Sequence, residues 1–508
     1  MKKFIFSICL TTVILSFIAL SQVSTNDNNP VLNFKKIDAN NVSTTIRNDG
    51  SFDKNYMTGS GGFEWPQGSG KTAIYISGLW LSSKVNDSIR VSYSDYDSEF
   101  EPGYFDYATQ TPMGKDDPLY RIYKVSPSFP NGNSDFDPWS AWPVNQGAPW
   151  VDVNNNGTYE PPADYPVMKG SQNLFCSFTD GYKDTSATTR NTPPMRAEVH
   201  LYAYAKENSG CVSNTVYYEW KIINKNISQW TDMSAAIWSD FDIGTSNNDK
   251  AGTDSTLNLV YGYNGINNDP VYGIAPPAVG YLIKEATGHS LNKSDFAVRW
   301  RCAFDCPTDS LQMYRVLHGL RINGSKWINP LTNKATMFPF SGDPVTSAGW
   351  IDSTQGERYI LIGSIFGTVA TLDTIDFKTV TFINKGADNL QSIVMIKNCV
   401  SDVISVKQLS TNIPLEFKLD QNYPNPFNPK TVISYKLAAS SFISLKVYNS
   451  LGKEVAVLVN QQQNVGSYEI DFDASGLASG VYFYRIAVHS DKLESENFSD
   501  TNRMILLK

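Results

Sequence analysis

The residues best suited to chemistry are oxygen-bearing side chains in two short loops. The first loop, DVNNNGTYE at 152–160, has oxygen side chains at its first, third and fifth positions and glycine at its sixth. This spacing matches the start of a calcium loop, because alternate side chains point inward and glycine allows the sharp bend. The expected ligands are the side chains of Asp152, Asn154 and Asn156, the carbonyl of Thr158, and a further carboxylate from Glu160 or Asp164.

This first loop departs from the EF-hand pattern. Its twelfth position is Ala163, where an EF-hand has a bidentate glutamate. Only Asp152 among the first three ligands is charged, so we expect modest affinity. An Asn/Gly turn explains the same residues equally well. The prediction is a structural Ca²⁺ site, with a simple turn as the alternative.

The second loop is acidic. The segment SDFDIGTSNNDKAGTDSTLN at 239–258 contains four carboxylates, Asp240, Asp242, Asp249 and Asp254. Clustered hard oxygen ligands in a glycine-containing loop suit calcium. Residues two apart on a strand share a face, so Asp240 and Asp242 could instead form the carboxylate pair of a glycoside hydrolase. We prefer calcium or a solvated loop.

Other catalytic patterns find no support in the sequence. GSGKT at 68–72 lacks the first glycine of a phosphate-binding loop, since that position is Trp65. The four histidines are far apart in sequence, and no HExxH, CxxC or GxSxG motif is present. We therefore assign no catalytic residue and lean toward a non-enzymatic protein. Three tryptophans among prolines are candidates for a sugar-binding platform or for a local core: Trp139, Trp142 and Trp150.

Length and composition set the wider frame. The 508 residues suggest two or three domains, and 13% aromatic residues favour strands. The net charge of −8 gives no support for a nucleic-acid partner. Six cysteines are present, and removal of Cys9 with a leader leaves five, so at least one thiol is free or pairs between chains. Cys302 and Cys306 either close a small loop or are buried apolar residues.

The first residues predict a signal peptide. Lys2 and Lys3 precede an almost entirely apolar run, 4–20, and Ala19-Leu20-Ser21 fits cleavage by signal peptidase after Ser21. The alternative is a retained membrane anchor, because the apolar run is about long enough to span a bilayer. We prefer a signal peptide at 1–21.

The passenger, residues 22–410, has strand-like runs and no long amphipathic helical pattern. In TVYYEWKIIN at 215–224, alternate apolar residues face one way. We expect an irregular, loop-rich β-sandwich made of an N-terminal β region at 22–105, a Pro/Asn/Asp-rich insertion at 106–195 and a sandwich-like domain at 196–410. The sequence leaves open whether the first and last of these share one core.

The C-terminal segment, 415–508, contains short strands separated by turns, which is typical of a small β-sandwich. Its motifs are, in order, NYPNPFNP at 422–429, LKVY at 445–448, LGKEV at 451–455, GVYFYR at 480–485 and RMILLK at 503–508. The segment resembles the type A C-terminal sorting domain of the type IX secretion system of Bacteroidetes and related phyla. The prolines cannot donate ladder hydrogen bonds, so they suit a protected sheet edge.

This resemblance implies a mainly β, multidomain protein that ends in an immunoglobulin-like sandwich and is secreted or held on the outer cell surface. It implies recognition by the translocon, cleavage by a sortase-like surface protease, and release or attachment to lipopolysaccharide. The residues that carry the sorting signal would be Asn422, Tyr423, Pro424, Asn425, Pro426, Gly452, Gly480, Tyr482 and Lys508.

The passenger also resembles an uncharacterised group of secreted proteins with this sorting domain. The motifs that carry this likeness are GFEWP at 62–66, SEFEPG at 98–103, WSDFDIG at 238–244 and PPAVGY at 276–281. The likeness implies no activity. We expect a structural or adhesive protein with calcium-stabilised loops; the alternative is a protein that binds or degrades carbohydrate, with extracellular glycans as partners.

Overall fold

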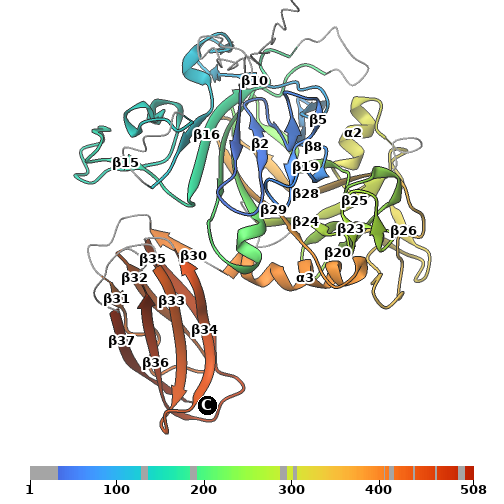
Figure 1. Ribbon diagram of the computed structural model, residues 1–508. Coiled ribbons are helices and arrows are strands. Elements are labelled where there is room, and N and C mark those ends of the chain that lie inside the picture. Colours follow the sequence, from blue (N-terminus) through green and yellow to red (C-terminus); the bar gives the residue numbers. More distant parts are fainter. Residues whose placement is uncertain are drawn as a thin grey trace, which may run out of the picture.

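Two large antiparallel sheets form most of the passenger in the computed structural model (Figure 1). The structure describes residues 33–127, 135–183, 192–286, 295–300, 306–405, 407–410, 417–438, 441–463, 466–489 and 498–507. The predicted signal peptide, Cys302 and Lys508 lie outside these residues. Among the described helices, none has the length and apolar content needed to cross a membrane.

The first sheet joins strands from both halves of the passenger. Its order is β1 (Phe34–Ile37), β2 (Thr44–Arg47), β3 (Ser51–Phe52), β8 (Ile76–Val85), β19 (Trp230–Phe241), β28 (Arg358–Val369) and β25 (Phe296–Trp300), with β9 (Ser88–Tyr93) beside β8. Leu79 of β8 lies opposite Ile237 of β19. The regions 22–105 and 196–410 therefore share one sheet, which answers the question that the sequence left open.

The second sheet draws on the middle segment as well. Its order is β10 (Glu101–Pro102), β16 (Gln172–Thr179), β17 (Ala197–Ala205), β18 (Thr215–Asn224), β29 (Thr374–Asn384), β24 (Ala278–Ala286), β21 (Leu259–Asn264) and β20 (Asp249–Asp254), with β13 (Tyr123–Val125) beside β16. β16 comes from the 106–195 segment and pairs along its whole length with β17. That segment is thus part of the sandwich as well as a source of loops.

The main core lies between these two sheets. The alternate side chains predicted to share a face of β18 are all buried there: Val216, Tyr218, Trp220 and Ile222. They pack in one cluster with residues of the first sheet, including Leu79 and Ile237. Burial of each large apolar side chain contributes about 1.5–3 kcal/mol. The mainly β, sandwich-type fold predicted from alternation is confirmed.

Short elements decorate this sandwich. The two-stranded hairpins are β4–β5 (Lys54–Asn55, Ser60–Gly61), β6–β7 (Phe63–Glu64, Thr72–Ile74), β11–β12 (Tyr104–Asp106, Thr111–Met113), β14–β15 (Trp150–Val151, Tyr165–Pro166), β22–β23 (Asn268–Asp269, Gly273–Ile274) and β26–β27 (Trp327–Asn329, Lys334–Thr336). The 3₁₀ turns are η1 (Pro118–Tyr120), η2 (Trp139–Ala141), η3 (Val144–Gln146), η4 (Gly210–Asn214) and η5 (Ser246–Asn248). The glycine-rich GSGKT segment forms the connection between β6 and β7.

A long amphipathic helix corrects the expectation that the passenger has no long amphipathic helical pattern. α2 (Ser310–Val316) is short, whereas α3 (Asn389–Ser405) has 17 residues. The buried residues Ile393, Ile396, Val400 and Val403 recur at helical spacing and form one face of α3. That face packs on the outer side of the second sheet, in a second core that includes Leu259 and Phe382.

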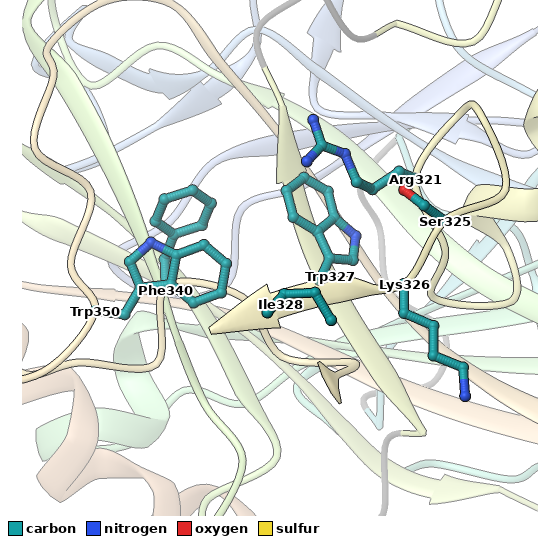
Figure 2. Close-up of a pocket in the computed structure, with 7 residues that line it drawn as sticks. All are labelled: Arg321, Ser325, Lys326, Trp327, Ile328, Phe340 and Trp350. Carbon is teal, nitrogen blue, oxygen red and sulfur yellow. The ribbon is translucent and has the colours of Figure 1, made fainter. Parts of the chain in front are cut away.

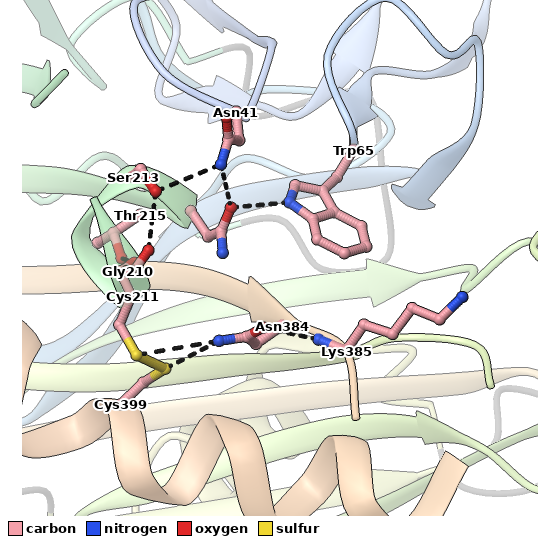
Figure 3. The surroundings of a disulfide bond; sticks show 10 residues. Asn41, Trp65, Gly210, Cys211, Ser213, Thr215, Asn384, Lys385 and Cys399 are labelled. Carbon is pink, nitrogen blue, oxygen red and sulfur yellow. Dashed lines mark hydrogen bonds between the residues drawn. A yellow bond between two sulfur atoms is a disulfide. The ribbon is translucent and has the colours of Figure 1, made fainter. Parts of the chain in front are cut away.

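A disulfide fixes α3 to the sandwich. Cys211 in η4 is bonded to Cys399 in α3, across 188 residues of sequence. Figure 3 shows the amide of Asn384 on β29 beside this bond, donating to the Cys399 sulfur at 3.2 Å. Cys306 is also disulfide-bonded, and Cys176 is a free, buried thiol. The odd cysteine count therefore leaves an unpaired thiol inside the main core.

The C-terminal segment is a sandwich with its own core. One sheet has the order β30 (Lys407–Ser410), β35 (Gly466–Asp473), β32 (Lys430–Leu437) and β31 (Lys418–Leu419). The other has the order β34 (Glu454–Gln463), β33 (Ser441–Asn449), β36 (Gly480–His489) and β37 (Phe498–Leu506). Its buried residues form a cluster that includes no passenger residue among those described. Because β30 pairs with β35, this sandwich begins at Lys407, earlier than the predicted 415.

Candidate functional site

Three of the four carboxylates predicted in the 239–258 loop act on one another. Asp240 is the next-to-last residue of β19, Asp242 follows that strand, and Asp249 opens β20. Electrostatic repulsion couples Asp242 to both of the others. Asp254, at the far end of β20, is apart from them and forms an ion pair with Lys397 at 2.9 Å. The structure therefore brings together three of these four residues.

Asp240 is held in a chain of hydroxyl groups that the sequence did not reveal. Tyr96 donates to Asp240 Oδ2 at 2.5 Å and lies 3.2 Å from the hydroxyl of Tyr359, which in turn donates to Glu357 at 2.7 Å. Asp240 is 3% exposed. Burial, and then the nearby charge of Asp242, raises its pKa to about 8. Burial therefore favours the protonated form of Asp240.

The neighbouring carboxyl groups are also shifted. Burial, and then repulsion from Glu357, raises the pKa of Asp242 to about 6. Burial raises the pKa of Asp249 as well, and Asp242 and Asp269 add to the effect. Glu357, the residue before β28, thus joins these carboxylates from more than 100 residues away in sequence. We call Asp240, Asp242, Asp249 and Glu357 the acidic cluster.

Several oxygens of this region are buried without a hydrogen-bond partner among the described residues. They are Oδ1 of Asp240, Asp242 and Asp249, and the amide oxygen of Asn248. Such groups cost roughly 1–3 kcal/mol each when left unsatisfied, and more when charged. The sequence predicted the three carboxylates but not Asn248, whose side chain donates to Asp269 at 3.1 Å and leaves its oxygen unused.

The charged side chains near the acidic cluster are paired with other residues. Arg358 binds Asp352 through two hydrogen bonds of 2.8 and 3.2 Å, and both side chains are fully buried. Asp269 accepts from Thr245 and Asn264 as well as Asn248, so its charge holds the loop together. The guanidinium of Arg358, which lies near Asp249, is therefore neutralised by Asp352.

In the present side-chain positions, the acidic cluster would coordinate a cation only incompletely. Within the described residues, no three His, Cys, Asp or Glu side chains are arranged to hold a metal ion between them. An ion would need small side-chain rotations together with amide oxygens such as that of Asn248. The unpartnered oxygens fit a hard divalent cation, which is bound by carboxylate and amide oxygens. Because Asp240 is almost fully buried, it does not line an open cleft, as a glycoside hydrolase pair requires.

The first predicted loop has a different geometry. Asp152 accepts from the backbone nitrogens of Asn156 and Gly157 at 3.2 and 2.7 Å. The amides of Asn154 and Asn156 both donate to Glu160, at 3.2 and 3.0 Å. Glu160 therefore lies beside the side-chain amides of Asn154 and Asn156, while Asp152 holds the backbone of the same turn. The amide oxygens of Asn154 and Asn156 accept from the backbone nitrogens of Asn156 and Thr158, so they would have to rotate to meet a cation.

The remaining predicted ligands of that loop are used in other ways. Both oxygens of Asp164 accept backbone hydrogen bonds, from Val153 at 2.9 Å and Glu160 at 2.8 Å, and the side chain is fully buried. Asp164 therefore closes the base of the loop, and Glu160 is the better fourth ligand. The amide of Thr158 donates to Asn156 at 2.7 Å.

The three tryptophans do not form an exposed platform. Trp139 and Trp142 are 7% and 3% exposed and belong to the second core. Trp142 donates to the carbonyl of Pro149 at 3.0 Å and packs against Phe175. Trp150 is half-buried against Tyr159. The local-core interpretation is confirmed for Trp139 and Trp142, whereas Trp150 keeps part of its ring exposed.

The sorting-signal residues tie the start of the C-terminal sandwich to its end. Asn422 is buried; its backbone nitrogen donates to the hydroxyl of Tyr484 at 2.7 Å, and its side chain donates to the carbonyl of Pro424 at 3.0 Å. Asn425 accepts from the backbone of Ile505 at 2.9 Å. Tyr423 is 82% exposed, so its ring is available to a partner.

The later signal residues shape turns and strands. Gly452 has a φ of +76° in the turn between β33 and β34, a conformation that favours glycine. Gly480 opens β36 opposite Leu506, and Tyr482 donates to the carbonyl of Ala478 at 2.8 Å. Pro426 lies beside Asn425 in the segment that contacts β37. The buried Tyr484, which the sequence analysis did not single out, links Asp420 and Asn422.

Comparison with known proteins agrees with this sandwich. Residues 421–496 match the family described as the secretion system C-terminal sorting domain. The chain therefore carries a type IX secretion sorting domain and is a secreted or outer cell-surface protein that interacts with the type IX machinery. A search of curated proteins gave no match.

Solved structures add little. The adhesin domain of Epf from Streptococcus pyogenes is 11% identical over 57% of this chain and 79% of that one, with a TM-score of 0.13. That score is too low to support an argument about fold or activity.

Proposed function

We propose that the passenger is a structural or adhesive protein of the cell exterior whose loops are stabilised by calcium. The observation that carries the proposal is the set of buried, unpartnered oxygens of Asp240, Asp242, Asp249 and Asn248. A folded protein pays a high cost for buried carboxylates unless they are protonated, paired or bound to a cation. Outside the cell, calcium is abundant enough to fill weak sites.

The residues that would hold the ion are Asp240, Asp242, Asp249 and Asn248. Bound calcium supplies positive charge, which offsets the mutual repulsion of these carboxyls. Asp242 links the end of β19 to the loop before β20, so an ion here would join the two sheets of the sandwich at that end. The 152–160 loop is the second proposed site, held by Asp152, Asn154, Asn156 and Glu160.

Thermal unfolding with and without calcium tests the proposal. At a calcium concentration 100 times the dissociation constant, one site stabilises the folded state by about 2.7 kcal/mol. The melting temperature should therefore fall by a few degrees when a chelator is added. Asp242→Asn should remove most of this calcium-dependent gain. Asp254→Asn is the matched control, because Asp254 pairs with Lys397 and should leave the gain intact.

Two results would contradict the proposal. The first is a melting temperature of the native protein that does not respond to chelation. The second is an equal loss of calcium dependence in the Asp242 and Asp254 variants. Asp152→Asn tests the second site in the same assay, and it should reduce the calcium-dependent gain without altering the effect of Asp242→Asn.

The fate of the protein outside the cell belongs to the same proposal. Signal peptidase would remove residues 1–21, and a sortase-like surface protease would cleave the sorting domain after export. The passenger would then be released or joined to lipopolysaccharide. The mass of the passenger recovered from medium and from washed cells separates these two fates.

A further inference from the structure

A pocket lies on the segment between α2 and β28, away from the predicted sites. Its volume is about 500 Å³, within the range of small-molecule sites. Its walls include the rings of Trp327, Phe340 and Trp350 and the charged side chains of Arg321 and Lys326 (Figure 2). No acidic residue lines it. The pocket thus combines aromatic faces with positive charge.

The rings form a connected wall. The ring centroids of Phe340 and Trp350 are 4.7 Å apart, and those of Trp327 and Phe340 are 6.4 Å apart. In Figure 2, Phe340 and Trp350 lie on one side of the pocket and Trp327 lies on the other. All three rings are half-buried. Unlike the tryptophans at 139 and 142, these rings keep part of their surface for a ligand.

The two cations are free to meet an anion. Neither Arg321 nor Lys326 has an acidic partner within ion-pair distance among the described residues. The Arg321 guanidinium lies 5.0 Å from the centre of the Trp327 ring, which orients it without neutralising it. Arginine binds carboxylates through two parallel hydrogen bonds. The charge of the pocket therefore favours an anionic ligand.

The backbone holds the rings in place at some cost. Phe340 has a φ of +60°, which is rare for a bulky residue. Its carbonyl accepts from Thr253 on β20 at 3.1 Å, and the carbonyl of Trp350 accepts from Gly342 at 2.8 Å. A side chain at Gly342 would clash with backbone atoms 2.6 and 2.7 Å away. Backbone strain of this kind clusters at active sites and ligand clamps.

One polar group at the pocket also lacks a partner. The indole nitrogen of Trp327 is buried and makes no hydrogen bond among the described residues. A buried tryptophan N–H usually donates to an oxygen. A ligand with hydroxyl groups beside its flat face would satisfy it.

We propose that this pocket binds a pyranose ring that bears a carboxylate, that is, a uronic-acid unit of an extracellular polysaccharide. The flat faces of Trp350 and Phe340 would stack on the sugar ring, and Arg321 and Lys326 would bind the carboxylate. The proposal goes beyond calcium stabilisation and does not depend on it. It relies on the cell-exterior location, where such polysaccharides are found.

Isothermal titration of the full chain with two oligosaccharides tests the proposal. Tetragalacturonate carries the carboxylates, and maltotetraose is the neutral probe. Tetragalacturonate should bind at least ten times more tightly, and 0.5 M salt should reduce this preference. Trp350→Ala should abolish binding of tetragalacturonate, whereas Trp350→Phe should retain part of it. Arg321→Gln with Lys326→Gln should remove the preference for the acidic probe.

The controls separate this site from general charge effects and from calcium. Lys334→Gln removes an exposed charge from β27, outside the pocket, and should leave binding unchanged. Titrations run with chelator and with calcium exclude bridging of the uronate by the ion. Absence of binding by either probe, equal binding of both, or full binding by a folded Trp350→Ala variant would overturn the proposal. None of these outcomes bears on the calcium-dependent melting temperature.

Discussion

Removal of the disulfide between η4 and α3 should destabilise the passenger strongly. Cys211 and Cys399 are 188 residues apart, so their bond closes a loop that includes three strands of the first sheet and five of the second. In the chain-entropy description, a loop of this length restricts the unfolded chain by about 5 kcal/mol. Whole domains are stable by about 5–15 kcal/mol, so the effect is a large fraction of the total.

Equilibrium unfolding in urea, followed by tryptophan fluorescence, measures this effect. The double variant Cys211→Ala and Cys399→Ala should unfold at a midpoint lower by about 1 M or more. The helix should still form, because Ile393, Ile396 and Val400 remain buried against the second sheet. Far-ultraviolet circular dichroism before the transition should therefore match that of the native protein.

The response to reductant is a second measure of what the disulfide contributes to stability. Reductant should lower the midpoint of the native protein by about as much as the double substitution does. It should lower the midpoint of the double variant much less, since only the bond at Cys306 remains to be reduced. Cys176→Ala, which removes a free buried thiol, should keep the full response to reductant. An unchanged midpoint in the double variant, or an equal response of variant and native protein to reductant, would refute the account.

Three further predictions concern pH, a buried ion pair and export. Burial raises the pKa of Asp53 from 3.8 to about 7, so the folded state binds a proton that the unfolded chain releases. The free energy of unfolding should therefore fall by up to about 4 kcal/mol as pH rises from 4 to 8. Midpoints of urea unfolding measure this fall, and Asp53→Asn should make it smaller. Arg358→Met removes the cation that pairs with the buried Asp352 and should lower the free energy of unfolding, measured in urea, by about 3–5 kcal/mol. The double variant Arg358→Met and Asp352→Leu should recover much of this stability. A chain that ends at Ser405 should keep the native near-ultraviolet spectrum but remain inside the cell, as immunoblots of medium and cells would show; its appearance in the medium would contradict the role of the sorting domain.

The sorting domain was predictable because its signals are local. The blocks that begin at Asn422 and Gly480 are short, ordered motifs, and the structure shows that they tie neighbouring parts of one small sandwich. Alternation in β18 was equally readable, since every second residue faces the core. Patterns within about ten residues thus predicted both the fold class and the export of the protein to the cell exterior.

The helix α3 was missed for a physical reason. Its buried face is made of Ile393, Ile396, Val400 and Val403, and such β-branched residues are enriched in strands. Composition therefore disagreed with the helical spacing that the same residues show. Tertiary packing against the second sheet outweighs the low intrinsic preference.

The candidate sites required contacts that no local pattern contains. Tyr96 and Glu357 meet Asp240 and Asp242 from connections far away in sequence, one after β9 and one before β28. The same is true of the pocket, where Trp327 and Trp350 meet only because the intervening chain folds back. Residue type predicted which carboxylates could bind a cation, but only the three-dimensional arrangement separated Asp254 from the rest.

The number of hydrogen-bond donors differs between the buried carboxylates of this fold. Asp180 accepts from Ser92, Met195 and Ala197 at 2.6–2.7 Å, so its charge is spread over the loop that it organises. Asp249 is equally buried, yet one of its oxygens has no partner. Since burial is the same in the two cases, it cannot explain the difference. Asp180, surrounded by donors, needs no cation, whereas the unpartnered oxygen of Asp249 calls either for protonation, as at Asp53, or for the proposed cation.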